Sequence, residues 1–133
     1  PDKGHGGLPD RDLLPRLLQA TRTAAPRHVT WRLSDEVVRD HYWLHVDDPN
    51  AGREFDARLR RGGVSLNDLA QCELWLDARL VDMTAPLTVS TPPLETEFTP
   101  TPTLRTLCDT MSRRGDPHLA ASWVLSLSPA AVK

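Results

Sequence analysis

The sequence predicts a mainly β domain, a small β-sandwich or a partly open barrel, with a helix at its N-terminal end and one helix before the last strand. Three observations predict this fold class. Apolar and polar residues alternate over six or seven short segments, turn signals separate these segments, and only two stretches place apolar residues at helical spacing. The length of 133 residues is enough for one modest hydrophobic core.

The first helix is expected over residues 13–22. Leu14, Leu17 and Leu18 would lie on one side of such a helix. Pro15 falls in the first turn, where the missing N–H of proline costs little, and the Ala-Ala-Pro sequence at 24–26 ends the helix.

Period-two alternation then predicts the strands, as in Val29, Trp31 and Leu33, which alternate with polar residues. Strands are expected at residues 28–33, 41–47, 54–60, 64–67, 72–76, 87–90 and 121–127. Turn-forming residues occupy 48–52 and 77–82, and Gly62-Gly63 predicts a hairpin. The proline- and threonine-rich segment 91–103 is expected to be a connector that crosses an edge of the sheet.

The second helix is expected to begin after Thr103, a suitable N-cap, and to end at Gly115. Its apolar residues recur at helical spacing and are expected to complete the core from one end of the sandwich. They are Leu104, Leu107, Cys108 and Met111.

Composition excludes some classes of function. The 16 basic and 18 acidic side chains give a net charge of −2, whereas a nucleic-acid-binding protein normally carries a basic surplus on one face. The two dense arginine stretches, 58–61 and 113–114, are expected at a hairpin tip and a helix end, as solvated charge. No segment has the roughly 20 apolar residues that cross a bilayer. No structural disulfide between Cys72 and Cys108 is expected, and a cytosolic and a periplasmic location are equally compatible with the sequence.

No complete catalytic machinery is predicted in this chain. There is no Gly-x-Ser-x-Gly motif, and Ser65, in the nearest approach to one, lies in a predicted strand. Cys72 and Cys108 lie on apolar stripes, where a thiol behaves as a small hydrophobe. Gly4-His5-Gly6-Gly7 does not have the pattern of a phosphate-binding loop, and no cofactor is expected.

A metal site is not predicted either. His41 and His45 would lie on one face of a single strand, but four residues along a strand separate them by about 13 Å, too far for one ion. The paired carboxylates Asp47 and Asp48 are explained by turn capping.

Four residues are candidates for binding: Trp43, Trp75, His41 and His45. Exposed tryptophans form sugar-binding platforms or contact surfaces. The alternative is that Trp43 and Trp75 pack under a helix or against another domain.

Several segments resemble a known family. They are 28–33, 41–46, 73–89 with its Leu-Val-Asp turn and following Pro-Leu-Thr-Val, and 104–117 with its closing Asp-Pro. Together they resemble the C-terminal β-domain of bacterial α/β-hydrolases of the polyhydroxybutyrate-depolymerase-like esterase and peptidase type. The Arg61-Gly62-Gly63 hairpin and the 91–103 connector depart from the pattern of that family.

The resemblance implies that residues 1–26 are a loop and the last helix of an upstream hydrolase domain, and that residues 27–133 are a β-sandwich-like accessory domain. His5 would then be the general base of a triad whose serine and acid lie upstream. The expected partner is that catalytic domain, with a homo-oligomer also possible. The alternatives are a binding module for a glycan or a protein, and an oligomerisation domain.

Overall fold

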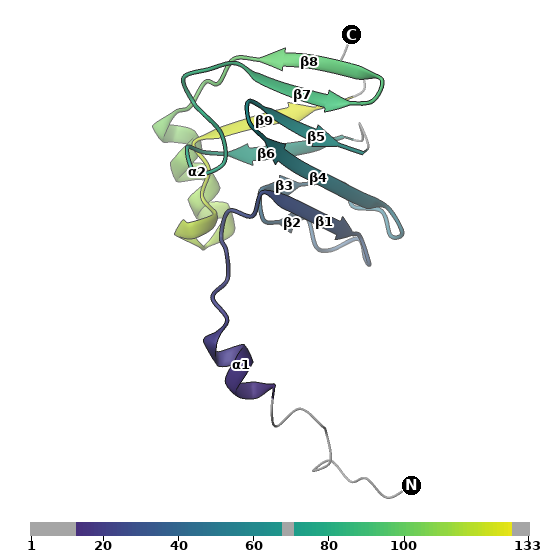
Figure 1. Cartoon of the computed structure of the whole chain (residues 1–133), viewed down its shortest axis with the longest axis vertical. Coiled ribbons are helices and arrows are strands. Elements are labelled where there is room, and N and C mark those ends of the chain that lie inside the picture. The colour runs from purple at the N-terminus through teal and green to yellow at the C-terminus, as the bar shows by residue number, and fades with distance from the viewer. Residues whose placement is uncertain (1–12, 68–70, 129–133) are drawn as a thin grey trace, which may run out of the picture.

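The computed structural model of the chain describes residues 13–67 and 71–128, and its strands form two sheets (Figure 1). The five-stranded sheet contains, in spatial order, β1 (His28–Arg32), β4 (Glu54–Arg60), β5 (Gly63–Leu66), β7 (Leu87–Thr91) and β8 (Leu94–Phe98). The four-stranded sheet contains β2 (Asp40–His41), β3 (Leu44–His45), β6 (Cys72–Leu76) and β9 (Trp123–Leu127). The fold is therefore a mainly β sandwich, as predicted, and its sheets do not close into a barrel.

The core lies between the two sheets, because each strand turns every second side chain inward. The five-stranded sheet contributes Val29, Trp31, Phe55, Ala57, Leu59, Val64, Leu66, Leu87 and Val89. The four-stranded sheet contributes Leu44, Cys72, Leu74, Leu76, Trp123, Leu125 and Leu127. The alternation read from the sequence thus identified the inward face of most strands.

The connection between β5 and β7 is a crossover. These two strands pair in parallel, whereas β6, which lies between them in sequence, belongs to the opposite sheet. Gly63 faces Thr88 across this pair, and a Cβ atom at Gly63 would lie 2.9 Å from the Thr88 carbonyl oxygen. The predicted hairpin at Gly62-Gly63 is confirmed, since Arg60 pairs with Gly63 and Gly62 has a φ of +76°.

The single strand predicted at 41–47 is wrong. The chain turns back at Tyr42 and Trp43, so β2 and β3 form a short antiparallel hairpin in which Asp40 pairs with His45. Tyr42 has a φ of +53°, which is rare for a bulky residue. The turn buries the Trp43 indole, whose N–H donates to the Pro26 carbonyl at 2.7 Å. Tertiary packing therefore overrides the period-two pattern here.

The connector predicted at 91–103 contains a further strand. β8 pairs with β7 through a tight turn at Pro92-Pro93, so that Thr91 lies opposite Leu94. β8 is an edge strand with largely exposed side chains, such as Glu95 and Glu97. An edge strand of this kind lacks the apolar alternation that reveals a buried one.

Helix α2 (Leu104–Arg114) has the predicted caps, because Thr103 Oγ1 accepts from the Thr106 N–H and Gly115 adopts a left-handed conformation. Its expected orientation is wrong. Cys108 and the apolar residues beside it are turned to solvent, and Thr110 is the residue of this helix that is buried. A 3₁₀ turn, η1 (Pro117–Leu119), follows and leads into β9. Cys72 lies in the core and Cys108 at the surface, and no disulfide joins them.

Helix α1 (Leu14–Gln19) is shorter than predicted and lies apart from the sandwich, at the end of an extended segment (Figure 1). Pro15 is in its first turn, as expected, but none of its residues is buried. In the described ranges, neither helix combines the length and the hydrophobicity needed to cross a bilayer.

Candidate functional site

The β2–β3 hairpin and β6 bring three of the four predicted binding residues together beside α2. Trp43, His45 and Trp75 are only 3%, 2% and 2% exposed. The backbone N–H of Trp75 donates to the Trp43 carbonyl at 2.8 Å, which fixes the hairpin against β6. The tryptophans are therefore packed inside the domain and do not form a surface platform. His5 lies outside the described residues.

The ring of His45 is held on both sides. Its Nδ1 lies 2.7 Å from Asp40 Oδ1, and its Nε2 lies 3.1 Å from Asp47 Oδ1 and 3.2 Å from the Arg113 guanidinium. The ring also stacks on Trp75 at a centroid distance of 5.2 Å. The nitrogen contacts thus join the hairpin to the end of α2, and the stacking on Trp75 joins it to β6.

His41 does not join this arrangement. Its ring stacks on Trp31 at 5.6 Å, on the side of the five-stranded sheet. The two histidines thus belong to different surroundings, which the expectation of a shared strand face did not foresee. Burial, together with the nearby positive charge of Arg114, lowers the pKa of His41 below its usual 6.5.

The indole of Trp75 faces away from the core and is covered by the end of α2. The guanidinium carbons of Arg113 and Arg114 lie 4.8 and 4.4 Å from its ring centroid. The Trp75 N–H donates to Glu73 at 2.9 Å. We call His45, Trp75, Arg113, Arg114 and Asp40 the aromatic–arginine cluster. It joins α2 to the four-stranded sheet by stacking and ion pairing.

Arg114 is the buried member of the aromatic–arginine cluster. Its side chain is 4% exposed and its guanidinium lies 3.2 Å from the Asp40 carboxylate. The expectation that Arg113 and Arg114 are both solvated is therefore wrong for Arg114. A planar, weakly hydrated guanidinium is suited to this position, because it stacks on an indole and pairs with a carboxylate at the same time.

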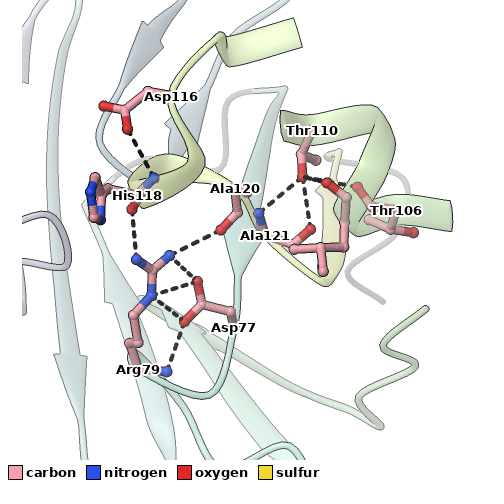
Figure 2. Close-up of polar contacts among 9 residues, drawn as sticks. Asp77, Arg79, Thr106, Thr110, Asp116, His118, Ala120 and Ala121 are labelled. Carbon is pink, nitrogen blue, oxygen red and sulfur yellow. Dashed lines mark hydrogen bonds and ion pairs between the residues drawn. The ribbon is translucent and has the colours of Figure 1, made fainter. Parts of the chain in front are cut away.

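A second set of contacts fixes α2 and η1 to the strands (Figure 2). Thr110 Oγ1 accepts from the Ala121 N–H at 2.9 Å and lies 2.8 Å from the Ala121 carbonyl. Arg79 forms an ion pair with Asp77 and donates to the carbonyls of His118 and Ala120. The buried face of α2 is thus polar, which explains why its apolar residues point outward.

A shallow groove of about 400 Å³ lies beside the aromatic–arginine cluster, where the segment from α1 meets η1. It is lined by Arg22, Asp40, His41, Tyr42, Arg113, Arg114 and Leu119. Arg22 pairs with Asp116 at 3.0 Å and so attaches the end of the N-terminal segment to η1.

The chemistry available to the aromatic–arginine cluster is limited. Both nitrogens of His45 face carboxylates or a guanidinium, so the ring is not presented to a nucleophile as a general base must be. Across residues 13–67 and 71–128, no group of three His, Cys, Asp or Glu side chains is placed to hold a metal ion. The aromatic–arginine cluster therefore has a structural role: it holds α2 against the four-stranded sheet.

Helices α1 and α2 each carry an exposed apolar surface. The α1 leucine face consists of Leu13, Leu14, Leu17 and Leu18, which are 47%, 59%, 66% and 80% exposed. The α2 apolar stripe consists of Leu104, Leu107 and Met111, also exposed. Apolar surface gathered on one side of a helix is typical of a contact with another protein surface.

No family model, curated protein or solved structure matches this chain. Function is therefore argued from these surfaces. Sequence reasoning identified Trp75 and His45 but missed the residues that enclose them, Arg113, Arg114 and Asp40. One sequence signal for this cluster was the pair Arg113-Arg114 in the last turn of a predicted helix. The sequence analysis interprets these two arginines as solvated charge.

Proposed function

We propose that residues 27–133 are a non-catalytic accessory domain and that the α1 leucine face, which precedes it, packs into a catalytic domain of the same polypeptide. The observation that carries the proposal is that Leu14, Leu17 and Leu18 are exposed while the sandwich has a closed core without them. A helix of six residues is too short to be stable in water by itself and depends on packing of its apolar face. The α1 leucine face therefore requires a surface outside the sandwich.

The resemblance to α/β-hydrolases supports the choice of partner. It assigns residues 1–26 to the end of an upstream catalytic domain and residues 27–133 to the accessory domain, and α1 falls in the first part. The sandwich would then present α2 and the groove beside it next to that domain and shape the entrance to its site. His5 would act as a general base only in the presence of the upstream serine.

The second candidate is oligomerisation through the same surfaces. Two unpaired apolar stripes on one chain allow a two-fold contact in which α1 of each copy packs on α2 of the other. A glycan-binding module is not favoured, because it needs Trp43 and Trp75 at the surface and both are buried.

The decisive experiment is amide hydrogen exchange of residues 14–19, compared between this chain alone and the full polypeptide that carries it. We expect fast exchange in the chain alone and protection in the full polypeptide. A variant with Glu at positions 14, 17 and 18 is expected to lose that protection, whereas Gln19→Glu, which lies off the leucine face, is expected to keep it. Equal exchange rates in the two samples would refute docking.

Two further measurements separate the alternatives. Sedimentation velocity of this chain over a range of concentrations is expected to show a monomer, and a concentration-dependent dimer abolished by the same glutamates would favour oligomerisation. Hydrolysis of p-nitrophenyl acetate and butyrate is expected only for the full polypeptide and is expected to be lost in its His5→Ala form. An inactive parent, or an active His5→Ala form, would remove the hydrolase part of the proposal.

A further inference from the structure

Four arginines from three separate segments line one groove of about 530 Å³. Arg60 ends β4, Arg61 lies in the β4–β5 turn, Arg27 precedes β1, and Arg79 follows β6. From the sequence, Arg60 and Arg61 were expected to be solvated charge at a hairpin tip. The structure adds Arg27 and Arg79 from other segments, so that the positive charge surrounds a concave surface.

This charge is only partly balanced by neighbouring acids. The Arg27 guanidinium donates to the carbonyls of Leu80 at 3.5 Å and Arg60 at 3.4 Å, which are neutral acceptors and leave its charge uncompensated. Arg79 is paired with Asp77. The carboxylate in the groove lining, Asp82, already accepts hydrogen bonds from the Thr84 N–H and hydroxyl at 2.8 and 2.6 Å. The Arg79 guanidinium is thus engaged by Asp77 and two carbonyls, whereas Arg27, Arg60 and Arg61 share the groove lining with one carboxylate, that of Asp82.

The backbone of Arg27 is fixed by the fold, and its exposed side chain lies along two carbonyl groups. Its two backbone contacts hold the guanidinium between the 77–82 turn and the end of β4, and the backbone N–H of Leu59 donates to the Arg27 carbonyl at 2.7 Å. Holding a charged side chain in advance reduces the entropy that a ligand must overcome on binding. The fold therefore directs the Arg27 guanidinium toward the groove before a ligand binds.

We propose that this groove binds a small organic oxyanion, through a phosphate or a carboxylate group held by Arg27, Arg60 and Arg61. Guanidinium groups bind both kinds of oxyanion with paired hydrogen bonds. The volume of about 530 Å³ lies within the range of small-molecule sites. Val81, Ala85 and Pro86 give the groove an apolar wall for the carbon part of such a ligand.

An adjoining hollow of about 420 Å³ extends the groove on the other side of Gly62. It shares Arg60 and Arg61 and is lined by the hydroxyl-bearing residues Ser65, Thr88 and Ser90. Hydroxyl groups donate to and accept from the polar atoms of a ligand. A ligand longer than a single phosphate group therefore has room to cross the turn. A nucleic acid is not favoured, since the chain carries a net charge of −2.

The test is a titration of the chain with inorganic phosphate, pyrophosphate and citrate, followed by calorimetry and by the backbone amide resonances of Gly62 and residues 78–82. We expect saturable shifts at these amides and weaker binding at higher salt concentration. Arg61→Gln is expected to weaken binding by about tenfold, the loss of one charge-assisted hydrogen-bonded contact. Arg105→Gln, which removes the same charge from an exposed position on α2, is expected to leave affinity unchanged.

Each outcome of the titration either supports the proposed oxyanion site or overturns it. Binding of pyrophosphate in preference to citrate assigns a phosphorylated ligand, and the reverse preference assigns a polycarboxylate. The absence of saturable shifts with all three probes up to about 10 mM would overturn the site. Equal losses in Arg61→Gln and Arg105→Gln would reduce the effect to general electrostatics and would also overturn it. These results do not depend on α1, so they are distinguishable from a failure of the docking proposal.

Discussion

The guanidinium carbon of Arg114 lies 4.4 Å from the ring centroid of Trp75, joining the last turn of α2 to the outer face of β6. The same guanidinium pairs with Asp40 at 3.2 Å. One side chain therefore connects a helix, a hairpin and a strand that are far apart in sequence, and the placement of α2 depends on it.

Replacing Arg114 with lysine is expected to lower the free energy of unfolding by about 1–2 kcal/mol. Lysine keeps the charge but loses the planar group that stacks on Trp75. The Asp40 side chain is 39% exposed, so solvent screening limits the loss from the ion pair. Urea denaturation checks this expectation, with Arg113→Lys as the control because Arg113 stacks on the same ring from an exposed position. Equal effects of the two substitutions would contradict the special role of Arg114.

Replacing Thr110 with valine is expected to destabilise the protein by about 1–3 kcal/mol. Valine has the same shape, but it leaves the buried N–H of Ala121 without the hydroxyl that accepts from it at 2.9 Å. Thr110→Ser keeps the hydroxyl and is the matched control. The midpoints of thermal or urea unfolding measure both changes, and a valine variant as stable as the serine variant would show that the hydrogen bond is unimportant.

The ring of His41 is expected to titrate below 6.5 in a pH series of NMR spectra. Burial disfavours the charged imidazolium, and the charge of Arg114 adds to this effect, so both lower the pKa. The unfolded chain then takes up this proton first as the pH falls. The stability linked to neutral His41 is therefore complete above pH 6.5 and is lost as the pH falls from 6.5 toward the folded-state pKa. His41→Phe is expected to reduce this loss of stability at low pH. A His41 ring with a pKa above 6.5 would contradict the expected effect of burial and of Arg114.

Replacing Gly63 with alanine is expected to cost about 1–3 kcal/mol of stability through overpacking. The new Cβ would lie 2.9 Å from the Thr88 carbonyl oxygen, which belongs to the backbone of the parallel partner strand and cannot rotate away. Ser65→Ala, on the same strand and facing outward, is the control. Calorimetric melting of the two variants compares them directly, and a Gly63→Ala protein as stable as the control would mean that β7 shifts freely.

The sequence was informative wherever one face of a strand is buried. Alternation of apolar and polar residues indicates directly which side chains of a strand are buried. It therefore placed in the core Val29 and Trp31 of β1 and Leu125 and Leu127 of β9. Alternation says nothing about pairing, so the parallel contact between β5 and β7 was not foreseen. The turn at Tyr42 was missed because its positive φ is imposed by packing of Trp43 and carries no turn signature of its own.

The candidate site was less predictable than the fold. The α2 apolar stripe was expected to face the core, as in most amphipathic helices. The structure turns it outward, because Thr110 bonds to Ala121, just before β9, and Arg114 pairs with Asp40 of β2. Such partners belong to other segments of the chain, and a helical pattern alone cannot reveal them.

The crossover of β5, β6 and β7 has a consequence for how the chain folds. Neither sheet draws its strands from one continuous part of the sequence, so neither can assemble while the other is absent. Contacts between distant segments slow folding because the intervening loops must close first. We therefore expect the sandwich to fold slowly and in a single cooperative step, with no stable half. A single cut in the segment between β6 and β7 should yield two fragments that each carry strands of both sheets, and these fragments should recover their structure only when they are mixed.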